Sequence, residues 1–250
     1  MTVFLLALAA LSAGWVDAVV GGGGLVQLPA LLLAYPNAAP IHILATNKLS
    51  SICGTTASAT TYYRRVKPDL RTAFPLAGIA FLGSMGGALI SSHLPRSAFN
   101  PVVFVVLIAV GAYTVLTPRL GLETRLRFQG HRHTIAAMAT GAAVGLYDGA
   151  LGPGTGSFFV IVLVSLLGYS FLQASAKAKL ANLATNFAAL VIFVPQGAVM
   201  WRLGLLMGAG NLLGGYLGAR TAVAKGAGFI RVILVLVVAA FAVKIGLTIF

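Results

Sequence analysis

The sequence is poor in charged residues, above all in acidic ones. Only 8% of its 250 residues are charged, and 17 Lys and Arg against four Asp and Glu give a net charge of +13. Hydrophobic residues make up 59% of the chain, and its mean hydropathy is +0.97. A soluble core cannot bury so much apolar surface, so the long apolar runs predict a protein that lies in a lipid bilayer. The basic residues fall in short segments between these runs, which indicates loops on one side of the membrane and excludes nucleic-acid binding.

Cysteine is almost absent as well. Cys53 is the single cysteine and falls inside a predicted membrane helix, so a disulfide framework and a cysteine metal site are both excluded, and we expect it to pack. His42 and His93 fall near helix ends, whereas His131 and His133 fall in a basic segment where we expect them to be solvated. None of them has a partner at ligand spacing. The sequence therefore predicts no metal site and no cofactor.

The N-terminus also lacks the basic segment that begins a secretory signal peptide. Its apolar run, residues 2–20, contains Gly14 and Asp17, and both recur deep in the chain as Gly145 and Asp148. A segment with an internal counterpart belongs to the folded protein, so we expect this run to be a structural helix.

A motif that occurs twice organises the chain. The pattern G-x-x-D-x-x-x-G-x-G starts at Gly14 and again at Gly145, 131 residues later. The same offset, with no gap, extends well beyond the motif. It pairs Ala45 with Ala176, Lys48 with Lys179, Leu49 with Leu180, Gly83 with Gly214, Gly87 with Gly218 and Ala88 with Ala219. Such an internal duplication in a membrane protein is typical of transporters.

Apolar runs and their interruptions predict the same order of helices in both halves. A short piece of 11 residues rises only about 16 Å, half of a ~30 Å hydrocarbon layer, and cannot cross alone. In the first half we expect an apolar segment at 2–20, a break at 21–24, a short piece at 25–35 and crossings at 41–63, 72–91 and 99–116. In the second half we expect a segment at 134–151, a break at 152–156, a short piece at 157–167 and crossings at 171–194, 201–219 and 229–250.

The basic loops set the expected orientation. The positive-inside rule assigns the segments 64–71, 119–132 and 220–231 to the cytoplasm. The two halves then have opposite orientations. The prediction is an all-α polytopic membrane protein with two inverted-topology repeats, each with a Gly-broken helical hairpin plus three transmembrane helices. Residues 1–117 form the first repeat, 118–133 a basic cytoplasmic linker and 134–250 the second repeat.

Glycines have two expected roles. Close helix packing explains those in G-x-x-x-G spacing and their neighbours, which are Gly83, Gly86, Gly87, Gly214, Gly215 and Gly218. The breaks at 21–24 and 152–156 instead expose backbone amides at the start of each short helix, and two such ends would form an anion site. The run Gly152-Pro153-Gly154-Thr155-Gly156-Ser157 superficially resembles a phosphate loop, but no Lys-Ser or Lys-Thr follows, which excludes nucleotide binding.

Polar residues recur at helical spacing in the next helix of each half. Each set occupies one helical face: Lys48, Ser51, Thr55 and Ser58 in the first half, and Ser175, Lys179, Asn182 and Asn186 in the second. A second alignment, at an offset of 139, matches 44–47 to 183–186 and leaves the local register open. A charge at helix centre costs about 2.5–3.5 kcal/mol, so it implies a partner or a function. Each lysine could snorkel to the interface, pair with Asp17 or Asp148, or bind substrate, and each aspartate could neutralise a lysine or carry a proton.

These residues resemble the TauE/SafE sulfite exporter family of transporters, also called TSUP, and look most like its YfcA-type branch. The resemblance covers essentially the whole chain. It rests on Gly21-Gly22-Gly23-Gly24-Leu25 with a proline soon after, Ala45-Thr46-Asn47-Lys48-Leu49, Tyr147-Asp148-Gly149 with Gly152-Pro153-Gly154-Thr155-Gly156, and Leu183-Ala184-Thr185-Asn186. It implies a multi-pass inner-membrane permease for sulfite, sulfonates or related sulfur-containing or organic anions.

The leading hypothesis is therefore a secondary-active transporter of small anions that works by alternating access, with coupling to protons through Asp17 or Asp148. Its partners would be the anionic substrate and the lipid bilayer. The expected substrate-binding residues are Gly22, Gly23, Gly24, Asn47, Lys48, Ser51, Thr55, Pro153, Gly154, Thr155, Gly156, Lys179, Asn182 and Asn186. A passive anion channel is the alternative. An intramembrane enzyme is disfavoured, since Ser51 and Ser157 have no evident catalytic partner. The sequence predicts neither oligomeric state nor direction of transport.

Overall fold

The computed structural model describes residues 2–91 and 121–249, and every regular element in these two ranges is an α-helix, as predicted. The predicted crossing at 99–116 and His93 lie outside the described residues. The helices are α1 (Thr2–Val20), α2 (Gly23–Ala34), α3 (Pro40–Val66), α4 (Leu70–Ser91), α6 (Gly130–Ala150), α7 (Thr155–Ser165), α8 (Phe171–Phe193) and α9 (Trp201–Ile249).

Backbone chemistry explains where several helices begin and end. α3 starts with Pro40 at its first turn, where a missing N–H costs nothing, and it ends at Val66, before Lys67, which adopts a left-handed conformation with φ of 50°. Two boundaries differ from the prediction. α6 begins at Gly130, inside the segment expected to be linker. α9 spans both predicted C-terminal crossings, with non-helical backbone at Gly226 (φ 76°) between two helical parts.

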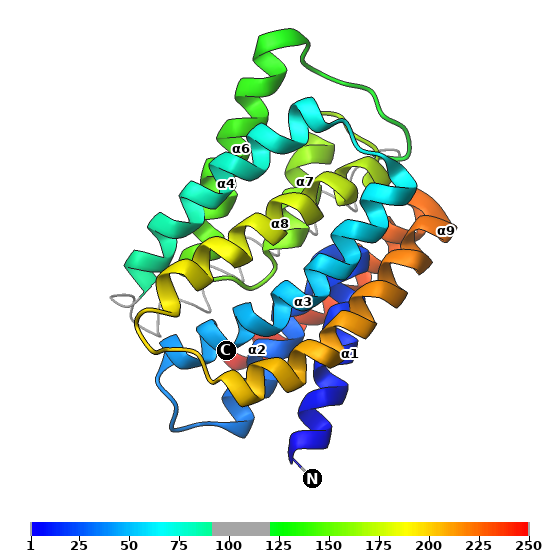
Figure 1. Ribbon diagram of the computed structural model, residues 1–250. Helices are drawn as coiled ribbons and strands as arrows, with labels where there is room; N and C mark the ends of the chain where they lie inside the picture. Colours follow the sequence, from blue (N-terminus) through cyan, green and yellow to red (C-terminus); the bar gives the residue numbers. More distant parts are fainter. Residues whose placement is uncertain (1, 92–120, 250) are drawn as a thin grey trace.

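The halves are interlocked, because helices of the first pack on helices of the second. α1 packs against α9, and α4 packs against α6 (Figure 1). The predicted packing glycines make these close approaches possible. A Cβ at Gly83 would meet the carbonyl oxygen of Ala142 at 2.8 Å, and one at Gly214 would overlap that of Leu11. These two contacts are equivalent at the offset of 131, so the contact between the halves is reciprocal, as a two-fold relation requires.

Equivalent helices also run in opposite directions. In Figure 1, α1 rises from the N-terminus while α6 descends from the opposite end, and α3 and α8 show the same opposition. A two-fold axis that relates the halves therefore lies across the helices rather than along them. The inverted topology of the repeats in a bilayer stays a prediction, which these directions support.

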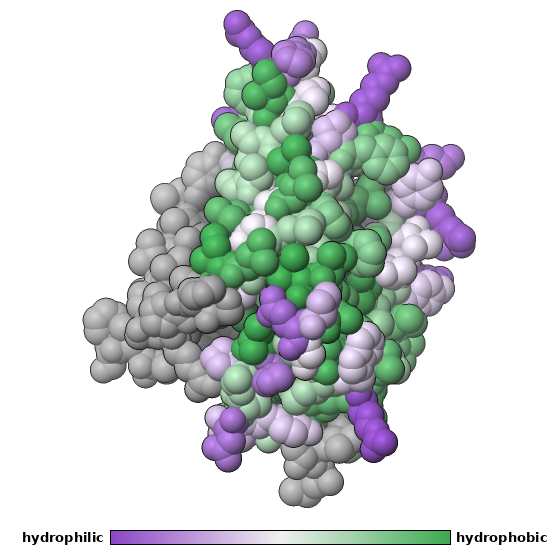
Figure 2. All heavy atoms as spheres, turned by 60° about the vertical axis from the view of Figure 1, so that its left-hand side comes forward, coloured by the Kyte–Doolittle hydropathy of each residue, from purple (hydrophilic) through white to green (hydrophobic). Residues whose placement is uncertain are grey.

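Apolar side chains cover much of the outer surface. On α4, Phe74, Leu82 and Leu89 are 63%, 61% and 56% exposed. Figure 2 shows a broad hydrophobic area across the centre of one face, with long hydrophilic side chains projecting from its edges. By length and hydropathy, α4 is the one helix in the described part of the chain that qualifies as membrane-spanning, with a mean hydropathy of 1.7. Shorter apolar stretches are Phe4–Val20, Gly23–Ala34 and Thr155–Ser165.

α7 lies inside the protein. Nine of its residues are buried, and it packs against α6 and α8. A helix too short to cross a bilayer can end at membrane depth only where protein surrounds its free backbone groups. The fold meets this condition and places the first turn of α7 at the centre of the molecule.

Candidate functional site

The two glycine breaks meet at the centre of the molecule. Gly21 separates α1 from α2 with φ of +82°, and its carbonyl oxygen accepts a hydrogen bond from the N–H of Ser157, 3.2 Å away in the first turn of α7. The hydroxyl of Ser157 donates to the carbonyl of Val20 at 2.7 Å. A Cβ at Gly21 would overlap the backbone of Gly156. Glycine is therefore required here both by conformation and by the close approach.

The second break is built in the same way. Gly152 and Gly154 have φ of +88° and +76°, and α7 starts directly after them. Gly24, in the first turn of α2, lies beside this break: a Cβ there would be in van der Waals contact with the Cα of Pro153, at 3.4 Å. The N-terminal turns of both short helices thus approach one central point. Their free amides give that point a positive potential.

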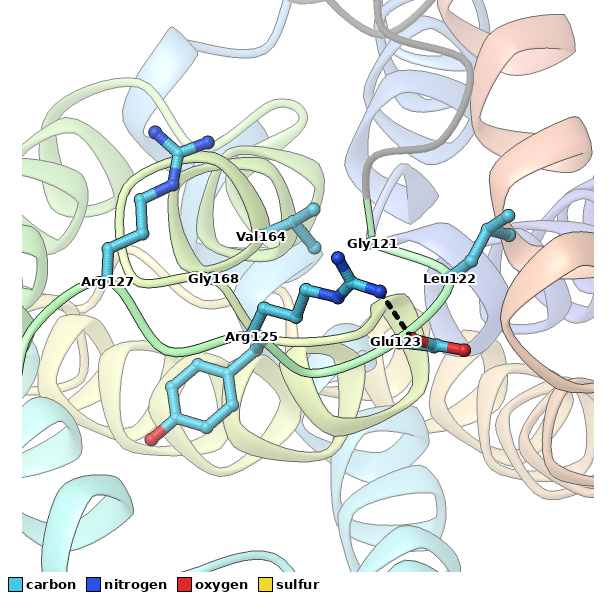
Figure 3. Close-up of a pocket in the computed structure, with 8 residues that line it drawn as sticks. Gly121, Leu122, Glu123, Arg125, Arg127, Val164 and Gly168 are labelled. Carbon is cyan, nitrogen blue, oxygen red and sulfur yellow. Dashed lines mark hydrogen bonds and ion pairs between the residues drawn. The ribbon is translucent and has the colours of Figure 1, made fainter.

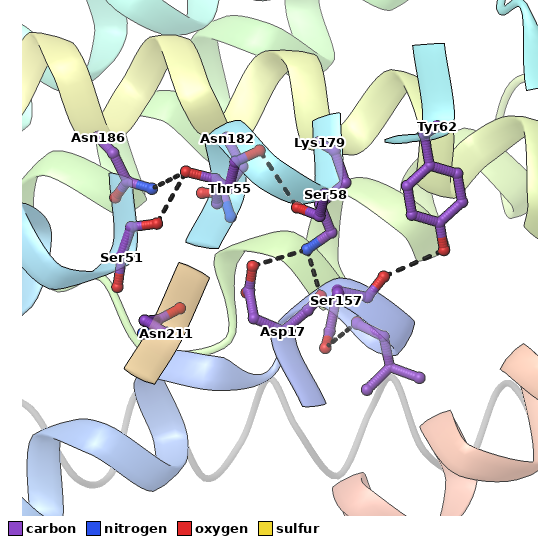
Figure 4. A network of polar contacts seen from close by, with 12 residues as sticks. Asp17, Ser51, Thr55, Ser58, Tyr62, Ser157, Lys179, Asn182, Asn186 and Asn211 are labelled. Atoms are coloured by element: carbon purple, nitrogen blue, oxygen red, sulfur yellow. Dashed lines mark hydrogen bonds and ion pairs between the residues drawn. The ribbon is translucent and has the colours of Figure 1, made fainter. Parts of the chain in front are cut away.

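Two buried ion pairs connect the halves at these breaks. Lys48 Nζ of α3 lies 2.6 Å from Asp148 Oδ2 at the end of α6, and both side chains are 2% exposed. Lys179 Nζ of α8 lies 2.9 Å from Asp17 Oδ2 at the end of α1 and also donates to the Asp17 carbonyl (Figure 4). The two pairs are equivalent at the offset of 131. Each lysine therefore neutralises the aspartate of the other half, and the snorkelling interpretation is wrong.

The predicted polar faces of α3 and α8 meet beside these ion pairs. Asn186 Nδ2 donates to Thr55 Oγ1 at 3.4 Å, and Figure 4 shows this contact between the two helices. These two residues are equivalent at the offset of 131. A residue that contacts its own counterpart lies near the axis that relates the halves, so this contact marks the centre of symmetry. The register at 131, rather than 139, describes these helices.

A small cavity of about 20 Å³ lies at this centre. It is large enough for about one water molecule. Most predicted site residues line it, together with two glycines that the prediction left out, Gly21 and Gly152. The lining residues are Asp17, Gly21, Gly24, Asn47, Lys48, Ser51, Asp148, Gly152, Thr155, Gly156, Asn182 and Asn186. The predicted residues that do not line it are Gly22, Gly23, Thr55, Pro153, Gly154 and Lys179. Their roles in binding stay predictions.

Sequence reasoning missed a buried polar group beside this site. Asn211 of α9 donates from Nδ2 to Gln27 Oε1 of α2 at 2.6 Å and lies 3.4 Å from Ser50 Oγ. All three side chains are at most 3% exposed. At the offset of 131, Asn211 corresponds to the apolar residue Ala80. Because Asn211 has no polar counterpart in the first half, the internal duplication could not identify this group.

A second polar cluster lies at the end of the molecule where α4, α6 and α8 begin. His133 Nε2 lies 2.7 Å from the hydroxyl of Tyr169, which donates to Thr72 Oγ1 at 3.3 Å, and Thr72 Oγ1 donates to Asp69 Oδ2 at 2.7 Å. The ammonium of Lys177 lies 4.1 Å from the centre of the Tyr169 ring. The expectation that His133 is solvated is wrong, because its side chain is buried, whereas His131 is exposed.

The cluster shifts the pKa values of its members. Burial would raise the pKa of Asp69, but hydrogen bonds from Thr72 and from the backbone of Arg71, with the charge of Lys177, outweigh it and lower that pKa. Burial, reinforced by the charge of Lys177, lowers the pKa of His133, while Asp69 opposes this shift. His133 is therefore held neutral to a lower pH than an exposed histidine.

We expect this histidine to make stability depend on pH. Its folded-state pKa lies below the ordinary 6.5, so protonation favours the unfolded chain, and stability falls as the pH drops below about 6.5. The melting temperature of the purified protein should fall by a few degrees more between pH 7.5 and 5.5 than that of His133→Gln. His131→Gln is the matched control and should keep the pH dependence of the unmodified protein. An unchanged pH dependence in His133→Gln would contradict this role.

Comparisons with known proteins find one matching family and several similar proteins. The family model of the sulfite exporter TauE/SafE matches residues 6–245. The probable membrane transporter protein ORF9 of Sinorhizobium sp. is 37% identical over 95% of this chain and 89% of its own length. The probable membrane transporter protein YfcA of Escherichia coli (strain K12) is 37% identical over 94% of this chain and 86% of its own length. A probable membrane transporter protein of Haemophilus influenzae is 34% identical over 90% of this chain. No solved structure matches.

Proposed function

Since the chain belongs to the sulfite exporter TauE/SafE family and is a membrane transporter, we propose that it carries small anions by secondary-active transport. Sulfite, organosulfonates and related sulfur-containing or organic anions are the proposed cargo. The two halves would rock against each other and expose the central site to either side in turn. The name of the family, sulfite exporter, and the donor chemistry of the site both support this choice. We place the protein in the inner membrane as a multi-pass protein.

One observation carries the proposal: two broken helices, Lys48 and several amide side chains converge on one buried point between the halves, and Lys179 is paired with Asp17 beside it. The first turns of α2 and α7 present backbone N–H groups there. Asn47, Asn182 and Asn186 present side-chain amides, and Lys48 presents charge. Lys179 does not line the cavity but is paired with Asp17, which does. The backbone N–H groups, the side-chain amides and the lysines all donate to oxygen, and charged donors make the stronger hydrogen bonds. An oxyanion has only acceptors, so its chemistry matches this set.

The small volume of the cavity supports alternating access. A cavity of about 20 Å³ has no room for sulfite, and the polar residues around it, apart from the partly exposed Ser51, are at most 9% exposed. We therefore interpret this conformation as a closed intermediate of the proposed cycle. To admit an anion, the halves must separate, and the ion pairs between them are the polar contacts that such a movement would strain.

Charge balance supports coupling to protons. Lys48 and Asp148, like Lys179 and Asp17, form neutral pairs in a buried site. An anion that entered alone would leave a net negative charge there, which is costly. If a proton neutralises Asp17 or Asp148 as the anion binds the released lysine, the net charge of the site does not change. We therefore propose that each anion moves with a proton carried by one of these aspartates.

Binding to the purified protein tests the proposal. Melting temperatures would be measured with sulfite, sulfoacetate, taurine, thiosulfate, sulfate and simple carboxylates. A sulfur oxyanion should stabilise the protein, and this stabilisation should vanish in Lys48→Met/Asp148→Leu and in Lys179→Met/Asp17→Leu. Each double variant removes one positive and one negative charge together, so the net charge does not change. Arg220→Ala, on the exposed face of α9, is the control and should keep the shift. The same stabilisation in all four proteins would refute the central anion site.

A further inference from the structure

A larger cavity lies far from the ion pairs, at the segment that joins the two halves. It has a volume of about 490 Å³ and is formed between this segment and the connection from α7 to α8 (Figure 3). Its lining residues are Gly121, Leu122, Glu123, Arg125, Arg127, Val164, Gly168 and Tyr169. Two backbone hydrogen bonds fix the joining segment there: Arg125 N donates to Gly168 O at 2.7 Å, and Arg127 N donates to Leu167 O at 3.1 Å.

The charge of this cavity is positive. Arg125 and Arg127 both line it, and Figure 3 shows both side chains extending from the joining segment. Arg125 lies 3.2 Å from Glu123, but both side chains of this pair are highly exposed, at 86% and 75%. Such exposed pairs contribute little and exchange partners readily. Arg127 makes no ion pair or side-chain hydrogen bond with any residue in the two described ranges, so its donors are available to a ligand.

The cavity also has an apolar side. Leu122 and Val164 line it, and Leu122 and Leu126 are 47% and 48% exposed on the same segment as the two arginines. Arginines close to exposed leucines on one segment are suited to the boundary between water and hydrocarbon, where apolar side chains face lipid and guanidinium groups reach headgroups. A free inorganic anion would contact only the arginines. A ligand with an anionic end and an apolar end would use both kinds of residue.

The position of the cavity agrees with such a ligand. Figure 1 shows that the end of α3, the start of α4 and the start of α6 lie at one end of the molecule. Basic residues are concentrated in these segments and in the joining segment before α6: Arg64, Arg65, Lys67, Arg71, Arg125, Arg127 and Arg132. A basic end of a membrane protein attracts acidic phospholipids, and each Lys or Arg adds about 1 kcal/mol near the surface.

We propose that this cavity binds the headgroup of an anionic phospholipid. The phosphodiester lies between Arg125 and Arg127, and the glycerol backbone lies against Leu122 and Val164. The volume of about 490 Å³ accepts a headgroup, while the acyl chains extend into the bilayer. A bound lipid would hold the segment that joins the halves against the end of α7, whose other end contributes to the central site.

Native mass spectrometry of the full chain, released from nanodiscs, tests this site. The bilayers would contain phosphatidylcholine with or without phosphatidylglycerol, and the variants would be Arg125→Gln/Arg127→Gln and the control Arg64→Gln/Arg65→Gln. The control removes the same charge from exposed arginines at the same end of the molecule. We expect one retained phosphatidylglycerol, with its occupancy ratio to free protein lowered at least about tenfold in the first variant and less than about twofold in the control.

Three results would overturn the proposal. Equal loss in both variants would mean diffuse attraction to a basic surface. Equal retention of phosphatidylcholine would mean that the anionic charge is not recognised. Displacement of the lipid by millimolar inorganic phosphate would identify a site for a soluble anion. The readout is independent of any transport assay, so it does not depend on the proposed cargo.

Discussion

Replacing Lys48 with methionine, while Asp148 stays in place, is expected to destabilise the protein by about 3–5 kcal/mol. The ammonium and the carboxylate lie 2.6 Å apart with both side chains 2% exposed, so the variant would leave a buried carboxylate without its partner. Removing one member of a buried pair is costly because the remaining charge has already lost its water. Reversible unfolding in mixed micelles would measure the difference in free energy.

The double variant Lys48→Met/Asp148→Leu is the decisive control. It removes both charges and keeps apolar volume, and such replacements are often neutral for stability. We expect it to recover most of the loss, and we expect Lys179→Met alone and Lys179→Met/Asp17→Leu to behave in the same way. A double variant as unstable as the single one would show that the two side chains do not stabilise each other.

The second large loss of stability is expected from Gly21→Ala. Gly21 has φ of +82°, which costs a residue with a side chain about 1–2 kcal/mol, and its new Cβ would overlap the backbone of Gly156. Backbone cannot move aside as a side chain can, so overpacking adds about 1–3 kcal/mol. The variant should lose about 3 kcal/mol or more in the same unfolding assay.

Alanine substitutions at two nearby glycines distinguish the cost of the positive φ from the cost of the backbone overlap. Gly154 has φ of +76°, but its Cβ would meet nothing closer than 3.5 Å, so Gly154→Ala should lose only about 1–2 kcal/mol. Gly24 has no such φ, and its Cβ would lie 3.4 Å from Pro153, an ordinary contact, so Gly24→Ala should change stability by less than about 1 kcal/mol. Equal effects at Gly21 and Gly24 would contradict the close contact between the two breaks.

The local features of the fold could be predicted because they depend on short-range chemistry. Gly21 and Gly152 interrupt apolar runs, and the helices end there within a few residues of the predicted points. Pro40 starts α3 because proline fits the first turn of a helix without loss of a hydrogen bond. The start of α6 at Gly130 was missed because its first turn carries His131, Arg132 and His133. These polar residues made the segment resemble a linker.

The pairing within the site could be predicted only as one of several alternatives. The duplication identified Asp17, Lys48, Asp148 and Lys179 as related residues, but it could not show which lysine faces which aspartate. The structure pairs them across the halves because α3 and α8 cross at the central axis. Asn211 could not be predicted, since its counterpart at the offset of 131 is Ala80 and nothing local distinguishes it from other helix residues.

Uptake of radiolabelled sulfite into proteoliposomes under an imposed pH gradient tests the central claim most directly. Protein-free liposomes correct for passive entry, and trans sulfite tests for counterflow, which a channel does not show. We predict that the unmodified protein shows counterflow and faster uptake when the lumen is alkaline, and that Asp17→Asn or Asp148→Asn loses the response to the gradient. Uptake with no counterflow, or with the same pH response in both aspartate variants, would contradict proton-coupled anion transport at the paired lysines.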